Sequence, residues 1–122
     1  MKHLPDTELE VMKSLWKAGD RSSRADLEQY LTRFQWNSNT INTYLQRLKQ
    51  KGFVKAERDG RDNVYTALVS REDYLAFDSR SMLDRLYGTP KNFIAALARG
   101  GIRPEELHQL QELLDELEEQ DG

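Results

Sequence analysis

The sequence contains no cysteine and only two histidines, His3 and His108. It can therefore form no disulfide or thiolate metal site, and two histidines are too few for a histidine-based metal centre. The longest apolar run, Phe93 to Ala98, is too short to span a bilayer, and no apolar signal region follows Lys2. We expect a soluble cytoplasmic protein with no metal, no cofactor and no membrane insertion.

Signals of an enzyme are also missing. The sequence has no glycine-rich phosphate loop, and its carboxylates fall in helical patterns without a companion nucleophile or metal ligand. We therefore predict that the protein is not an enzyme. Hydrophobic residues make up 38% of the chain and charged residues 32%, which suits a small, mainly helical protein with much exposed surface.

Positive charge is concentrated in the first part of the chain. Residues 1–69 carry 12 Lys and Arg against 9 Asp and Glu, whereas residues 70–122 carry 6 against 12. Between Arg33 and Arg61 the balance is 7 against 2. Such an asymmetry indicates that the basic part contacts nucleic acid, with a solvated basic face as the alternative.

Three helices are predicted within this basic part. A capping box that begins at Thr7 predicts the start of the first helix, and a similar pattern at Ser23 predicts the second. The third is predicted over residues 38–51. Asn37 or Ser38 can cap its start, and Gly52 supplies a left-handed C-terminal cap.

The third helix separates an apolar stripe from a polar face. Ile41, Leu45 and Leu48 recur at helical spacing and form the inner stripe. The opposite face and its flanks carry amides, hydroxyls and one arginine, which can hydrogen-bond to base edges in a DNA major groove. A face exposed only to solvent would more often carry Glu and Lys. The candidates for base or groove contact are Asn39, Thr40, Asn42, Thr43, Gln46 and Arg47.

Two short strands, 53–58 and 63–67, are predicted after this helix, joined by a tight turn at Asp59-Gly60. Basic side chains on and beside this hairpin suit contact with phosphates, with an ordinary surface turn as the alternative. The candidates for phosphate contact are Lys49, Lys51, Lys55, Arg58 and Arg61. Three helices followed by a basic hairpin describe a winged helix-turn-helix, which we assign to residues 1–69.

Residues 70–122 are predicted to form a helical dimerisation domain, so that the fold is mainly α with a small β-hairpin. The last helix begins near Pro104 and carries leucines in an a/d heptad pattern. A second subunit could cover this seam, which could alternatively pack within its own subunit. The candidate dimerisation residues are Tyr74, Leu83, Leu86, Phe93, Leu107, Leu110, Leu114 and Leu117.

Motifs across nearly the whole chain resemble the BlaI/MecI-type penicillinase repressor family. They are Leu9-Glu10-Val11-Met12-x-x-Leu15-Trp16, Trp36-x-x-x-Thr40-Ile41-x-Thr43-x-Leu45-x-Arg47-Leu48-x-x-Lys51-Gly52, Gly60-Arg61-x-x-x-Tyr65, Tyr74 and Arg85-x-Tyr87-Gly88. The resemblance implies a homodimeric transcriptional repressor with an N-terminal winged-helix domain and a C-terminal dimerisation domain. It further implies binding to a two-fold symmetric DNA operator and control of β-lactam-resistance-type genes.

The resemblance also implies a route of induction, in which a membrane-bound sensor protease triggers cleavage of the repressor near an Asn-Phe bond. Here the aligned position holds Ala96-Leu97, while an Asn-Phe pair stands four residues earlier, at Asn92-Phe93. Relief of repression by proteolysis between these positions is therefore an expectation that the sequence leaves open. The family's copper-responsive branch uses C-terminal cysteines, and this chain has none.

A hypothesis of another class is a winged-helix module that binds protein, without sequence-specific DNA binding. In that case the leucine-rich part of the chain would dock a different partner. The two hypotheses differ in salt dependence, because phosphate contacts release counterions and make DNA binding steeply salt-dependent.

Overall fold

A computed structural model describes residues 1–121 of the chain, which divide into two compact units, Met1–Ser79 and a second unit that begins at Arg80. The elements, in chain order, are α1 (Asp6–Lys17), β1 (Arg21–Ser23), α2 (Arg24–Leu31), the 3-10 turn η1 (Thr32–Phe34), α3 (Ser38–Gln50), β2 (Val54–Asp59), β3 (Asp62–Ala67), α4 (Arg71–Met82), the π-helical turn η2 (Leu83–Tyr87), α5 (Pro90–Gly101) and α6 (Pro104–Asp121).

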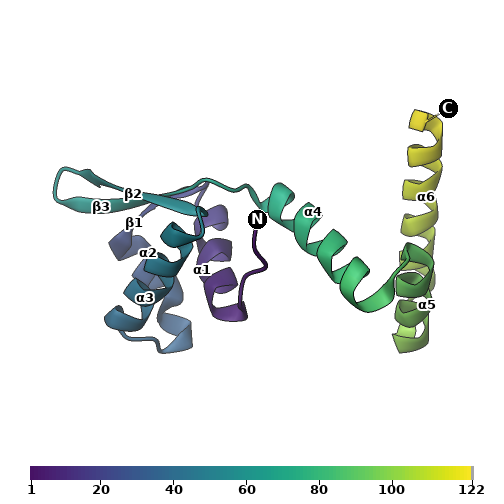
Figure 1. The fold of residues 1–122 in the computed structure, drawn as a ribbon, viewed down its shortest axis with the longest axis horizontal. Helices are drawn as coiled ribbons and strands as arrows, with labels where there is room; N and C mark the ends of the chain where they lie inside the picture. The colour runs from purple at the N-terminus through teal and green to yellow at the C-terminus, as the bar shows by residue number, and fades with distance from the viewer. Residues whose placement is uncertain (122) are drawn as a thin grey trace. The chain divides into compact units, whose positions relative to one another are not determined.

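The mainly helical fold with a small β-hairpin is confirmed, and the sheet has one strand more than predicted. β2 and β3 form the expected antiparallel hairpin, and β1 pairs with the other edge of β3 to give the order β1-β3-β2. β1 has only three residues, so it is too short to show an alternating pattern in the sequence. Figure 1 shows the sheet beside the three helices of the first unit.

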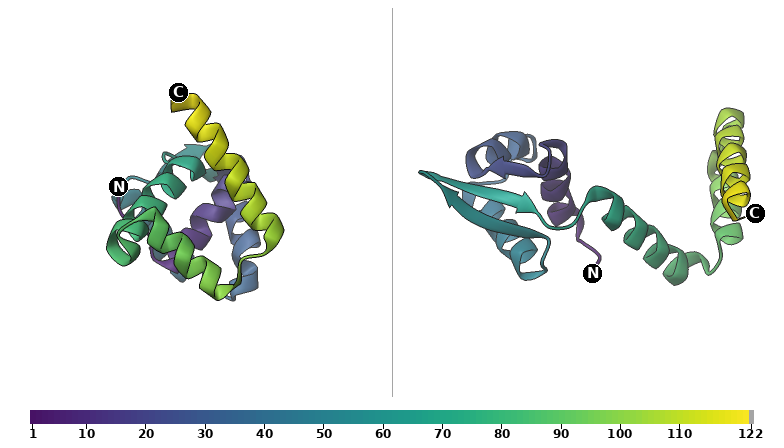
Figure 2. Two further views of the ribbon diagram at one scale, coloured as in Figure 1. Left: turned by 90° about the vertical axis from the view of Figure 1, so that its right-hand side faces the viewer. Right: turned by 90° about the horizontal axis from the view of Figure 1, so that it is seen from above.

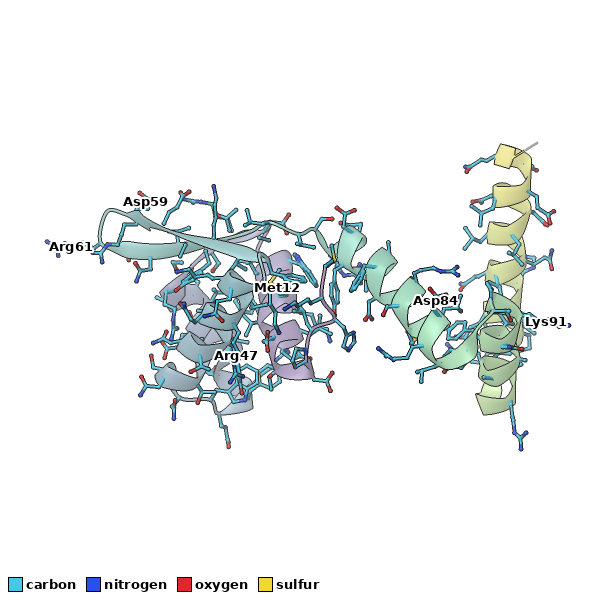
Figure 3. All side chains as sticks on the ribbon, in the orientation of Figure 1. Met12, Arg47, Asp59, Arg61, Asp84 and Lys91 are labelled. Carbon is cyan, nitrogen blue, oxygen red and sulfur yellow. The ribbon has the colours of Figure 1, made fainter. Side chains whose placement is uncertain are left out.

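The core of the first unit lies where α1, α2 and α3 pack together. α1 contacts both of the other helices, and its apolar stripe supplies Val11, Met12 and Leu15, which are fully buried. Met12 is labelled inside the first unit in Figure 3. Together with Leu27 from α2, these side chains belong to the same buried cluster as the apolar stripe of α3.

Helix starts follow the predicted side-chain caps in α2 and α3 but not in α1. Ser23 Oγ accepts from the Asp26 backbone N–H at 3.1 Å, as predicted. The capping box at Thr7 is wrong, because α1 already begins at Asp6 and has no side-chain cap. Glu10, which would have reached back to Thr7, instead forms ion pairs with Lys13 and Arg33.

Tyr74, near the start of α4, belongs to the core of the first unit. Its side chain is 1% exposed, and its hydroxyl accepts from the backbone N–H of Leu4 at 3.0 Å. Burial raises the pKa of Tyr74; the Leu4 hydrogen bond opposes this rise, while the charges of Asp78 and Asp6 add to it. The structure thus places Tyr74 in the interior and not on the predicted dimerisation surface. For the same reason the division between units lies within α4 and not at residue 69.

The second unit contains η2, α5 and α6. The Thr89 side chain caps α5 by accepting from the Asn92 backbone N–H at 3.2 Å. Phe93 packs edge-on against Tyr87, with ring centroids 5.1 Å apart. At the start of α6, hydrogen bonds from the Arg103 side chain and backbone lower the pKa of Glu106.

We expect Tyr74→Phe to lower the free energy of unfolding by about 1–3 kcal/mol, because the buried Leu4 N–H loses its acceptor while the ring is kept. Urea denaturation measures this change. Tyr30→Phe is the matched control, since Tyr30 is 46% exposed and its hydroxyl has no protein partner within residues 1–121. Equal stability of the wild type and Tyr74→Phe would show that this hydrogen bond does not anchor α4.

Candidate nucleic-acid interface

The exposed face of α3 is the first part of the candidate interface. Ile41, Leu45 and Leu48 are at most 1% exposed, so the inner stripe predicted from the sequence is buried. Its burial fixes the rotation of the helix about its own axis. Of the six predicted base-contacting residues, Thr40 is half-buried and the other five are exposed: Asn39, Asn42, Thr43, Gln46 and Arg47.

Several of these side chains line one open hollow on the surface of α3. The hollow is formed by Asn42, Thr43, Gln46, Arg47 and Gln50. Thr43 Oγ donates to the Asn39 carbonyl oxygen at 3.0 Å, which orients the hydroxyl along the helix. Gln50 lies in the same row but was not among the predicted residues, although its position on the polar face could have indicated it. The hollow thus offers both donors and acceptors.

The turn between α2 and α3 is held by aromatic side chains and a cap. Trp36 stacks on Phe34, with ring centroids 4.6 Å apart, and meets Tyr44 edge-on at 5.0 Å. Gln35 has φ of 59°, a left-handed conformation that reverses the chain after η1. Asn37 Oδ1 then accepts from the Thr40 backbone N–H at 2.8 Å and begins α3. These contacts position the polar face.

Arg24 connects α2 to α3, and the sequence analysis missed it. Its guanidinium donates to Asn42 Oδ1 at 3.0 Å, and to both oxygens of Ser38 at 3.1 and 3.2 Å. It also pairs with Glu28 at 3.3 Å. No local pattern in the sequence indicates a contact between residues on two different helices.

The β2–β3 hairpin is the second part of the candidate interface. It extends beyond the helices of the first unit, as Figure 2 shows from above. Asp59 pairs with Asp62 in register, so the loop consists of Gly60 and Arg61 and lies one residue later than the predicted turn. Gly60 has φ of 65°, which suits the first position of a type II′ turn. Arg61 is labelled at the tip in Figure 3.

The predicted phosphate-contacting residues differ in whether a carboxylate of the protein pairs with their positive charge. Lys55 pairs with Glu57 at 3.0 Å, although both side chains are more than half exposed. Within residues 1–121, no carboxylate oxygen lies within 4.0 Å of the cationic nitrogens of four residues: Arg47, Lys49, Arg58 and Arg61. The hairpin carboxylate Asp59 is engaged by Arg21 at 3.3 Å.

Lys51 is placed in a structural ion pair and not on the open surface. Its ammonium lies 2.5 Å from Glu8 Oε1, and the Glu8 side chain is only 2% exposed. Because Lys51 is the C-terminal cap of α3 and Glu8 belongs to α1, this pair joins the two helices. The structure therefore does not place the Lys51 charge where a phosphate could take it.

The predicted dimerisation residues of the second unit lie at its surface to different degrees. Leu86 is 64% exposed, while Leu107, Leu114 and Leu117 are each nearly half exposed, as is the neighbouring Leu113. The others, Leu83, Phe93 and Leu110, are of intermediate exposure. The α6 seam is therefore only partly covered by the described residues of its own chain.

Both dipeptides of the predicted cleavage region lie within α5. Asn92 and Phe93 are in its first turn, where the Asn92 side chain donates to the Tyr87 carbonyl oxygen at 2.8 Å. Ala96 and Leu97 lie further along the same helix and are exposed.

Other kinds of site find no support in residues 1–121. No group of three or more His, Cys, Asp or Glu side chains is placed to hold a metal ion there. Within the same residues no helix is both long and apolar enough to cross a membrane. The open polar groups of α3 and the free cations of the hairpin match the chemistry of base edges and phosphates.

Comparison with known proteins agrees with this assignment. A model of the penicillinase repressor family matches residues 4–116. The chain is 33% identical over 121 residues to the penicillinase repressor of Bacillus licheniformis, covering 95% of this chain and 94% of that one. It is 30% identical over 98 residues to the methicillin resistance regulatory protein MecI of Staphylococcus aureus, covering 80% of this chain and 71% of that one.

A solved structure matches the winged-helix part. It is the monomeric form of Bacillus licheniformis BlaI in complex with the blaP half-operator, which is 35% identical with a TM-score of 0.52. The match covers 60% of this chain and 89% of the BlaI chain. The winged-helix fold of the first unit is thus that of a solved DNA-bound repressor.

We expect Lys51→Met to lower the free energy of unfolding by about 3 kcal/mol, because the buried Glu8 carboxylate loses its counter-ion. Chemical denaturation measures the change. Lys49→Met is the matched control: Lys49 lies on the same helix, is exposed and has no carboxylate partner in residues 1–121, so its stability should change by less than about 0.5 kcal/mol. Equal effects of the two substitutions would contradict a structural role for Lys51.

Proposed function

Because this chain belongs to the penicillinase repressor family, a family of DNA-binding repressors, we propose that it represses transcription as a homodimer on a two-fold symmetric operator. In this proposal α3 is the recognition helix and the β2–β3 hairpin is the basic wing. One observation carries the proposal: burial of the Ile41, Leu45 and Leu48 stripe turns a face of amides, hydroxyls and Arg47 to the surface.

Base recognition is assigned to the exposed face of α3. Amide and hydroxyl groups donate to and accept from base edges, and an arginine can hold the O6 and N7 atoms of guanine with two hydrogen bonds. Arg47 suits this role because its side chain has no carboxylate partner within residues 1–121. The proposed base or groove contacts remain Asn39, Thr40, Asn42, Thr43, Gln46 and Arg47.

Phosphate contact is assigned to the wing and the end of α3. Arg58 lies beside the hairpin tip, Arg61 lies in the two-residue loop at the tip, and Lys49 lies on α3. Such contacts position the protein and supply affinity without choosing a sequence. Lys55 is a weaker candidate because Glu57 offsets its charge. Lys51 is not included, since its ammonium is committed to Glu8.

Dimerisation is assigned to the second unit. Leu107, Leu114 and Leu117 repeat on α6 at heptad spacing and stay nearly half exposed. Apolar side chains in such a seam are stabilised when a second helix covers them. The proposed dimer contacts are Leu83, Leu86, Phe93, Leu107, Leu110, Leu114 and Leu117.

Release from DNA by proteolysis is a further part of the proposal, as is control of β-lactam-resistance-type genes with a membrane sensor protease as partner. Similarity to the penicillinase repressor of Bacillus licheniformis and to the methicillin resistance regulator MecI supports the control of resistance-type genes. A protease acting on the region from Asn92 to Leu97 would need the helix α5 to unwind locally, because both dipeptides lie in helical backbone.

The experiment that tests the proposal is selection of bound sequences from a random duplex pool at about 0.15 M salt. We expect an enriched motif with two-fold symmetry and half-sites about 34–36 Å apart, one helical turn, or a multiple of that. No enrichment would overturn the proposal and favour a winged-helix module that binds protein.

We expect Arg47→Ala to weaken binding to the selected duplex by roughly 5- to 150-fold, equivalent to about 1–3 kcal/mol, and binding to random duplex far less. Arg61→Ala is the control for a phosphate contact: it should weaken both alike and lower the slope of affinity against salt by about one. An equal loss of affinity for both duplexes would mean that Arg47 contacts the DNA backbone and not a base.

A cut between Asn92 and Ala98, made at an engineered protease site, should convert the dimer to a monomer, because it separates α6 from the start of α5. Sedimentation measures the change. A nicked chain that stays dimeric on DNA would refute induction by cleavage in this region.

A further inference from the structure

Arg24 lies beside the proposed recognition helix, and its guanidinium donates to acceptors of the protein itself. Its side chain is 15% exposed. Nε donates to Asn42 Oδ1 at 3.0 Å, and Nη2 donates to Ser38 O and Oγ at 3.1 and 3.2 Å. Nη1 donates to Glu28 at 3.3 Å. A guanidinium engaged in this way acts on its protein neighbours and is not free to grip a phosphate.

The bond to Asn42 fixes the orientation of that amide. A guanidinium can only donate, so the Asn42 carbonyl oxygen, and not its NH2 group, must face Arg24. The NH2 group therefore points away from Arg24, and within residues 1–121 it has no protein acceptor. Asn42 is exposed and lines the open hollow on α3. Asn42 therefore presents a hydrogen-bond donor, its NH2 group, to this hollow.

A purely structural role would not need this bond. The two bonds to Ser38 already join α2 to the first residue of α3. A cation at a helix N-terminus is also unfavourable, because the helix dipole is positive at that end. The additional bond to the exposed Asn42 is explained if the orientation of the amide matters.

We propose that Arg24 is a positioning residue for base recognition: it holds the Asn42 amide with its NH2 group toward the DNA. Asn42 then selects a base edge that offers an acceptor, namely a purine N7, guanine O6 or thymine O4. Cytosine presents only a donor in the major groove and is rejected at that position. This inference rests on the proposed function, because it requires α3 to lie in the major groove.

The test measures discrimination at single base positions in the selected duplex. Asn42→Ala first identifies the position that Asn42 reads, as the one where rejection of cytosine falls by about tenfold. We expect Arg24→Lys, which keeps the charge but loses the planar fork, to reduce rejection at the same position by at least about threefold. The double variant should lose no more than Asn42→Ala alone, because Arg24 acts through Asn42. The slope of affinity against salt concentration should be the same for these variants as for the wild type, because no phosphate contact is lost.

Two further variants separate this role from a loss of folding. Arg33→Lys makes the same exchange at an arginine that pairs with Glu10, and it should leave discrimination unchanged. Asn42→Asp can still accept from Arg24 but has no donor, so it should lose discrimination at the same position as Asn42→Ala does. Thermal unfolding of each variant checks that the chain is folded.

Two results would overturn the inference while leaving the proposed function intact. One is Arg24→Lys weakening all duplexes equally, with unchanged base preference. The other is Asn42→Asp keeping the wild-type preference against cytosine, which would mean that the Asn42 NH2 group does not produce that preference. If the wild-type chain shows no base preference at any position, the proposed function fails and this inference fails with it.

Discussion

Burial of three apolar side chains on α3 determines most of what the first unit presents to its surroundings. Ile41, Leu45 and Leu48 are at most 1% exposed, and burying each side chain of this kind stabilises the fold by about 1.5–3 kcal/mol. Rotating α3 about its axis would expose them and bury amides without partners. The polar face is therefore held outward by the same packing that stabilises the core.

Charged side chains hold α3 at both of its ends. Lys51, its C-terminal cap, forms an ion pair with the buried Glu8 of α1. At the other end, Arg24 of α2 bonds to Ser38 and Asn42. A helix fixed at both ends and along one face can present donors and acceptors with little freedom, as recognition of base edges requires.

Local patterns in the sequence predicted what depends on neighbours along the chain. Helical spacing identified the buried stripe of α3, and the caps at Ser23 and Asn37 marked the starts of α2 and α3. Long-range contacts were not predictable in this way. Lys51 was predicted to contact phosphate, but the structure places its ammonium beside Glu8, 43 residues away in the sequence. Tyr74 was likewise assigned to a dimer surface, although its hydroxyl bonds to Leu4.

The most direct test is an NMR titration of the full chain with the half-site duplex obtained by selection. If α3 lies in the major groove, the largest changes should occur in the side-chain amides of Asn39, Asn42 and Gln46, and in the backbone of the hairpin tip, residues 58–61. Signals from the exposed residues of α1 should shift little on addition of the duplex. Changes concentrated outside α3 and the hairpin, with the three side-chain amides unmoved, would contradict the account.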